Sequence, residues 1–120
     1  MDTAGAIPKE AISKRIRLEQ DIIESLFKIF NKRLRKYPDA AVYLFGSRVD
    51  LEKRGGDLDL LIVSRLAASH AYELGKHIRI DIKEELGDQK IDLLITPNPY
   101  ESDRPAFFRL ALMEGVQIWP

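Results

Sequence analysis

AVYLFGSR at residues 41–48 and DLDLLIV at residues 57–63 are the two stretches that decide how this chain folds. Both contain an apolar run of strand length, and the first run ends in a turn of small residues. Successive side chains of a β-strand point to opposite faces of the sheet, so Asp57 and Asp59 share one face of the second strand. The sequence therefore predicts two strands beside a turn, with two carboxylates that converge on one point.

Outside these stretches, the spacing of apolar residues predicts helices that alternate with strands. Pro8 suits the first turn of a long helix, and Pro38 ends that helix. Gly87 and Gly115 each follow a helical pattern as a C-terminal cap. The predicted elements are helices at about 8–36, 67–86 and 106–114, and strands at 41–45, 57–63, 91–96 and 116–119. This order predicts one domain over residues 1–120, of the α/β or α+β class, with a small mixed sheet of about four strands and a catalytic core at about 41–120.

The composition excludes several classes of protein. The chain has 120 residues, 45% hydrophobic and 32% charged, which fits one globular domain with a modest core. Its 19 basic residues equal its 19 acidic residues, so net charge does not favour a nucleic-acid or membrane partner. It contains no cysteine, which excludes disulfide bonds and thiolate metal sites. No apolar run reaches the roughly 18 residues of a membrane span, and we predict a cytoplasmic protein.

The paired carboxylates are suited to nucleotidyl transfer, in which a hydroxyl attacks the α-phosphorus of a nucleotide and pyrophosphate leaves. Two Mg²⁺ ions about 3.5 to 4 Å apart can clamp the attacking and leaving oxygens, and carboxylates of neighbouring strands are suitable ligands. Asp92 is the one acid in the apolar run 91–95, where a charge without a partner would be costly. We therefore predict Asp57, Asp59 and Asp92 as metal ligands and catalytic residues, with Asp92 also a candidate to accept the proton of the attacking hydroxyl.

The turn after the first strand is suited to binding phosphate. Gly46 lets the backbone approach a phosphate closely, and Ser47 adds a hydroxyl donor. Arg48 is placed to pair with the triphosphate. Alone, each of these signals fits an ordinary turn or a surface acid better than a site. Their joint occurrence in one strand-turn-strand unit, with a third acid in a later strand, favours a nucleotide and metal site.

The combined pattern resembles the minimal nucleotidyltransferase family of the DNA polymerase beta superfamily. The resemblance rests on residues 42–48, 55–61 and 91–93 and on the closing segment 112–116, and so covers nearly the whole chain. It implies that the glycine and serine of the turn bind ATP and that the three aspartates bind Mg²⁺. Many members of this family are antitoxins that silence a HEPN-domain ribonuclease toxin by transferring AMP to a hydroxyl on it. The resemblance thus implies a protein adenylyltransferase that acts by AMPylation in a toxin-antitoxin system.

Two other functions remain open at the level of the sequence. The same chemistry would serve to add nucleotides to the 3′ end of an RNA. A binding antitoxin that occludes its partner without catalysis would also fit the chain. The small size leaves little room for an acceptor-binding domain, so we predict a macromolecular partner, a HEPN-domain toxin, that brings its own hydroxyl to the site.

Three features outside the predicted site have simpler explanations. The helix at about 106–114 is apolar around more than one face, Phe108 included, which fits either a buried helix or an oligomer interface. His70 and His77 are two helical turns apart, too far for a helical metal pair, and we predict surface roles for both. For the basic cluster at 32–36, a solvated helix end is favoured over a contact with RNA or with an acidic partner.

Overall fold

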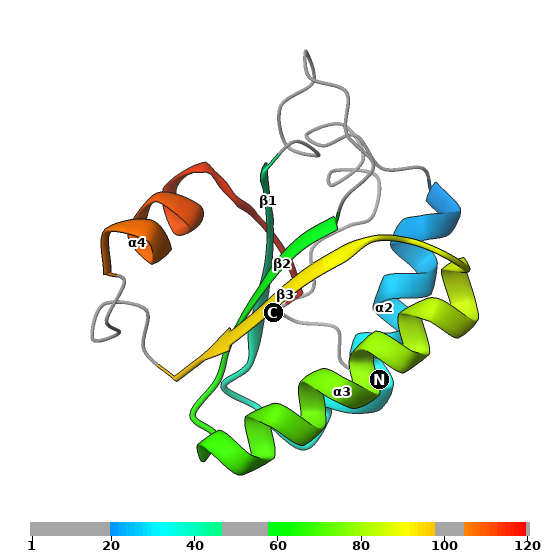
Figure 1. Ribbon diagram of the computed structural model, residues 1–120, viewed down its shortest axis with the longest axis horizontal. Helices are drawn as coiled ribbons and strands as arrows, with labels where there is room; N and C mark the ends of the chain where they lie inside the picture. The colour runs from blue at the N-terminus through cyan, green and yellow to red at the C-terminus, as the bar shows by residue number, and fades with distance from the viewer. Residues whose placement is uncertain (1–19, 47–57, 98–104, 120) are drawn as a thin grey trace.

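The computed structural model describes residues 20–46, 58–97 and 105–119 (Figure 1). Its helices are α2 (Gln20–Leu34), α3 (Ala68–Leu86) and α4 (Pro105–Glu114), and its strands are β1 (Ala41–Phe45), β2 (Leu58–Val63), β3 (Ile91–Thr96) and β4 (Val116–Trp119). The strands form one sheet in the order β3-β2-β1-β4. β2 and β3 run parallel, while β1 is antiparallel to both of its neighbours. The predicted small mixed sheet of four strands packed with helices is confirmed.

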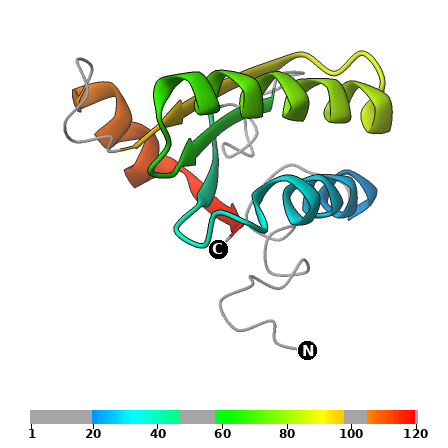
Figure 2. The same cartoon turned by 90° about the horizontal axis from the view of Figure 1, so that it is seen from below.

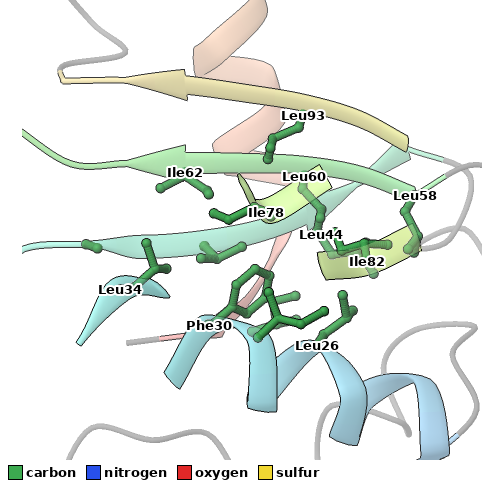
Figure 3. Packing of buried hydrophobic residues seen from close by; sticks show 14 of the residues in the cluster. Leu26, Phe30, Leu34, Leu44, Leu58, Leu60, Ile62, Ile78, Ile82 and Leu93 are labelled. Atoms are coloured by element: carbon green, nitrogen blue, oxygen red, sulfur yellow. The ribbon is translucent and has the colours of Figure 1, made fainter. Parts of the chain in front are cut away.

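The main hydrophobic core lies on one face of the sheet, between the strands and the helices α2 and α3. Leu44 of β1 and Leu60 of β2 point into it because side chains alternate along a strand. From α2, Leu26 and Phe30 are four residues apart, share one helical face and lie against these strands (Figure 3). Ile78 of α3 completes the contact from the second helix. This face of the sheet is therefore closed by apolar side chains.

A charged pair joins the two helices beside this core. Arg33 of α2 donates from Nε to Oδ2 of Asp81 on α3 at 2.5 Å and from Nη2 to Oδ1 at 3.0 Å. The hydrogen bond from Arg33 outweighs the burial of Asp81 and lowers the pKa of its carboxyl. Within the predicted basic cluster, Arg33 thus forms an ion pair between α2 and α3 and is not a fully solvated side chain. His77 lies on the exposed side of α3, 3.9 Å from Glu73, as predicted for a surface residue.

A second contact ties the residues before β1 to those after β2. Asp39 accepts a hydrogen bond from the Ser64 hydroxyl at 3.0 Å and one from the Arg65 backbone N–H at 2.8 Å. The Arg65 N–H is the main reason that the pKa of Asp39 is lowered. This carboxylate therefore anchors the end of the β1–β2 pair that lies away from Gly46.

The opposite face of the sheet carries a smaller apolar cluster under α4. Its buried members are Leu61, Phe108 and Ala111. Leu110 and Met113, on the other side of the helix, are 51% and 79% exposed. α4 thus contributes Phe108 to the core, while an oligomer contact through this helix remains a prediction. Figures 1 and 2 show α4 apart from α2 and α3, on the other side of the strands.

The element boundaries agree closely with the predicted ones. α2 begins at Gln20 in the described part of the chain, so the predicted start near residue 8 lies outside it, and the helix ends at Leu34 rather than near 36. Gly87 caps α3 with φ +76°, and its N–H donates to the Lys83 carbonyl. Among the helices of the described segments, none is long and apolar enough to span a membrane.

Candidate functional site

Asp59 and Asp92 are brought together by the pairing of β2 with β3. The two strands are parallel, and these two residues are register partners. Side chains of partnered residues project to the same face, and neighbouring strands are about 4.8 Å apart. Since Leu58 and Leu60 point into the core under α2 and α3, Asp59 points to the other face. The two carboxylates therefore stand side by side on the α4 face, at the end of the sheet where β2 and β3 begin.

The end of β1 reaches the same place. Phe45 is the antiparallel partner of Asp59, and Gly46 follows it with φ +83°. A Cβ atom on Gly46 would overlap Oδ2 of Asp59 and lie 3.0 Å from its Cγ. The Asp59 carboxylate thus rests against the backbone of Gly46, at a distance that only glycine allows. The turn glycine and the carboxylate form one unit.

The two carboxylates differ in their exposure. Asp59 is half-buried beside Gly46, whereas Asp92 is exposed to solvent. Asp92 therefore does not carry the expected cost of a buried lone charge, because its side chain is exposed to solvent outside the apolar layer. Its register position places it beside Asp59. An exposed acid next to a half-buried one can reach a bound ion and a second molecule at once.

Three predicted site residues lie outside the described residues: Asp57, Ser47 and Arg48. Within the described residues, no group of three His, Cys, Asp or Glu side chains is close enough to hold a metal ion. The pair of Asp59 and Asp92 supplies two of the three predicted ligands. Paired carboxylate oxygens are the donor set that Mg²⁺ prefers, so the residues present fit this ion.

The packing of Gly46 against Asp59 could not be found from the sequence. The small-residue turn pointed only to a close approach of phosphate, because nothing local says which residue of β2 faces the end of β1. The one available signal was the pair itself, a glycine at a strand end and an acid near the start of the next strand. The register of β1 with β2 converts that pair into a contact.

Residues 23–116 of the chain match the family described as nucleotidyltransferase domain. The matched segment contains Gly46 and both aspartates of the described site, and it spans the sheet from β1 to the first residue of β4. No curated protein matches the chain significantly.

Proposed function

The chain belongs to the nucleotidyltransferase domain family, and on that premise we propose that it transfers AMP from ATP, with Mg²⁺, to a hydroxyl on a protein partner. The observation that carries the proposal is the register pair of Asp59 and Asp92 on one open face, with Gly46 against Asp59. Carboxylates in adjacent positions repel each other unless a cation lies between them. A site that holds them together is therefore suited to a divalent ion.

The residues have different parts in this reaction. Asp59, held against Gly46, is a fixed ligand whose carboxylate has little freedom to move. When bound, Mg²⁺ neutralises charge on the triphosphate and on the leaving pyrophosphate. Asp57 is the proposed third ligand, and Ser47 and Arg48 are proposed to hold the phosphates.

The transfer needs no reactant beyond ATP, the acceptor hydroxyl and a carboxylate that takes up the proton. The oxygen of the acceptor hydroxyl bonds to the α-phosphorus as the bond from that phosphorus to the bridging oxygen of the β-phosphate breaks, and pyrophosphate leaves. The hydroxyl proton passes to a neighbouring carboxylate. Asp92 is suited to this task because it is exposed and stands next to the metal ligand Asp59.

The proposed acceptor is a HEPN-domain ribonuclease toxin, silenced by the added AMP. The exposure of Asp92 supports a macromolecular acceptor, since a hydroxyl on the surface of a second protein can approach it from solvent. In this proposal the chain acts as the antitoxin of the pair.

The test uses ATP labelled at the α-phosphate, MgCl₂ and the purified product of the gene adjacent to this one. We expect label on the partner protein, lost when Mg²⁺ is chelated. Asp59→Asn and Asp92→Asn should each lower the transfer more than about 100-fold, because each removes a charge from the metal site. Asp88→Asn, which neutralises an exposed acid outside the site, is the matched control and should retain the activity.

A second readout does not depend on activity. Mg²⁺ should raise the midpoint of thermal unfolding of the wild-type protein and of Asp88→Asn, but not of Asp59→Asn. If the wild type and Asp59→Asn are equally inactive and equally insensitive to Mg²⁺, the enzymatic proposal is wrong. Label on RNA instead of protein would show that the acceptor is an RNA 3′ end. Toxin neutralisation by Asp59→Asn at the wild-type level would show a binding antitoxin.

A further inference from the structure

In the described part of the chain, no strand pairs with the outer edge of β3. β3 is the outermost strand in the order β3-β2-β1-β4, with α3 running beside it (Figures 1 and 2). The carbonyls of Lys90 and Thr96 accept hydrogen bonds from the β2 side, from Leu58 and Ser64. Backbone groups alternate in direction along a parallel strand, so those of residues 91, 93 and 95 point away from β2. β3 thus offers alternate donors and acceptors to a further strand.

Leu93 lies at the middle of this edge, and one of its two backbone groups has a hydrogen-bond partner among the described residues. Leu93 is 6% exposed, and its carbonyl accepts a hydrogen bond of 3.0 Å from Nη2 of Arg79 on α3. Among the described residues, this carbonyl is the one edge group of residues 91, 93 and 95 with a partner. The Leu93 N–H points away from β2 and has no acceptor among the described residues, so it can donate to an added strand.

An apolar pocket of about 400 Å³ lies beside the same edge, between α3 and β3. Ala71, Tyr72 and Gly75 of α3 and Ile95 of β3 are among its walls, and Tyr72 is 71% exposed. Gly75 lies inside α3, where glycine makes the helix less stable than alanine would. The fold does not require it, because a Cβ there would meet its nearest atoms at 3.5 Å, an ordinary contact. The missing side chain keeps the pocket open at the expense of helix stability.

Basic residues lie at the other end of the β3 edge, and the apolar pocket and this basic part together are called the groove. A second hollow shares Arg79 with the first and is lined by Lys83 and Lys90 near Ile91, with Asp88 the one acid in its lining. Along the edge of β3, an apolar pocket near Ile95 is therefore followed by Arg79 at Leu93 and by Lys83 and Lys90 near Ile91, four residues from Ile95.

We propose that this groove binds an extended, acidic and apolar peptide segment of a partner protein, which adds to β3 as a fifth strand. Backbone hydrogen bonds to residues 91, 93 and 95 hold the segment, as in other cases of strand addition. An apolar side chain of the segment fills the space over Gly75. An acidic side chain pairs with Arg79, Lys83 or Lys90, which frees the Leu93 carbonyl for the added strand.

A peptide fits this edge better than a second copy of the chain. Two copies paired antiparallel through β3 would bring the Arg79 side chains towards each other across the two-fold axis, at the centre of the contact. Like charges that face each other across strands are destabilising. Each basic end would also lie against the apolar end of the other copy rather than against acids.

The proposal does not depend on nucleotidyl transfer, because it concerns binding at the edge of the sheet. It does bear on the site, since Asp92 belongs to the same strand. A segment paired with β3 would lie one strand spacing, about 4.8 Å, from the backbone that carries this carboxylate.

The test starts with an array of fluorescent octapeptides on a threonine background. One leucine and one glutamate are moved independently through all positions, and binding to the full chain is measured by fluorescence anisotropy. We expect the tightest binding when the two residues are four positions apart, the separation of Ile95 from Ile91. Peptides in which lysine replaces glutamate should bind at least about tenfold more weakly.

Strand addition leaves a signature with a period of two. Methylation of the peptide backbone nitrogens should abolish binding at alternate positions only, because every second N–H faces β3. In the protein, amide exchange at Ile91, Leu93 and Ile95 should slow when the peptide binds, while Asp92 and Leu94, which face β2, should not change. Uniform sensitivity to methylation, or no slowing at the three edge amides, would overturn the proposal.

Variants separate this groove from a general surface effect. Arg79→Glu should make the protein bind lysine peptides more tightly than glutamate peptides. Tyr72→Ala should weaken the binding of both kinds of peptide. Lys76→Glu changes the charge of an exposed α3 residue outside the groove and should leave binding unchanged. Equal effects of Arg79→Glu and Lys76→Glu would contradict the proposal. So would a change of oligomeric state without peptide binding, which would show a second copy on this edge.

Discussion

The two faces of the sheet are built from the same four strands, yet they differ in what covers them. On one face, α2 and α3 close a continuous apolar core in which Phe30 and Leu60 are fully buried. On the other, α4 covers the cluster around Leu61, and the carboxylates of Asp59 and Asp92 stand outside that cluster. Charged ligands need water or a counter-ion, so they are tolerated only on the face that is left partly open. The difference separates the residues that stabilise the fold from those proposed to act on a substrate.

The largest expected effect comes from breaking the closed face. Phe30→Ala removes a side chain that packs against Trp119 with ring centroids 6.2 Å apart and lies at the centre of the core. We expect the free energy of unfolding to fall by about 4 kcal/mol, measured by urea denaturation with circular dichroism. Leu110→Ala, on the exposed side of α4, is the comparison and should cost less than about 0.5 kcal/mol. Similar losses in the two variants would contradict the asymmetry of the faces.

On the open face, the next effect tests the contact of Gly46 with Asp59. Gly46→Ala should cost about 3 kcal/mol, because it adds an overlap with the carboxylate to the strain of a positive φ. Gly87→Ala has a similar φ but open space around its Cβ, so it should cost only the strain, about 1 kcal/mol.

A double-mutant cycle isolates the overlap, with Trp119 fluorescence as the probe of unfolding. In an Asp59→Ala background, the cost of Gly46→Ala should fall to that of Gly87→Ala, since the overlapping atoms are gone. An unchanged cost in that background would show that Asp59 is not held by the glycine.

Loss of the Arg33–Asp81 ion pair, beside the closed face, should lower the free energy of unfolding by an intermediate amount. Asp81→Asn removes the charge that accepts both hydrogen bonds from Arg33 and should cost about 2 kcal/mol at neutral pH. The pKa of Asp81 is lowered in the folded protein, mainly by the hydrogen bond from Arg33, so the carboxylate stabilises the fold above its unfolded pKa of about 3.9. This contribution is lost as the pH falls from about 3.9 towards the lower folded pKa.

The stabilities of wild type and Asp81→Asn should therefore converge in acid, as measured by denaturant titrations across that window. Asp39, whose pKa is also lowered, serves as the reference because Asp81→Asn leaves its acid sensitivity in place. If the difference in unfolding free energy between the two proteins stays constant with pH, the Arg33–Asp81 ion pair is not its cause.

The smallest effect is expected where the closed face meets the open edge of β3. Gly75→Ala should raise the free energy of unfolding by about 1 kcal/mol, because alanine favours the helix and its Cβ meets only ordinary contacts. The same change should weaken binding of the octapeptides to the groove. A gain of stability with unchanged binding would show that the pocket is not used, and a loss of stability would show that the space is needed for folding.

The elements of this fold could be predicted because their signals are local. The spacing of Leu26, Phe30 and Leu34 predicts a helix with one apolar face, and Gly87 follows α3 where a cap belongs. Asp59 and Asp92 could be selected as acids within apolar strands. The exposure of Asp92 could not be predicted, since it depends on how other elements pack on its face of the sheet.

The sequence by itself determined the order of helices and strands and the kinds of residues available for a metal site, because periodicity and turn chemistry act between neighbours along the chain. Only the tertiary structure decided that Asp59 pairs with Asp92, that Gly46 lies against Asp59 and that β3 has an open edge beside Gly75. These are contacts between segments far apart in sequence. They depend on strand order and register, which the pattern of a single segment does not specify because one segment can pair in several ways.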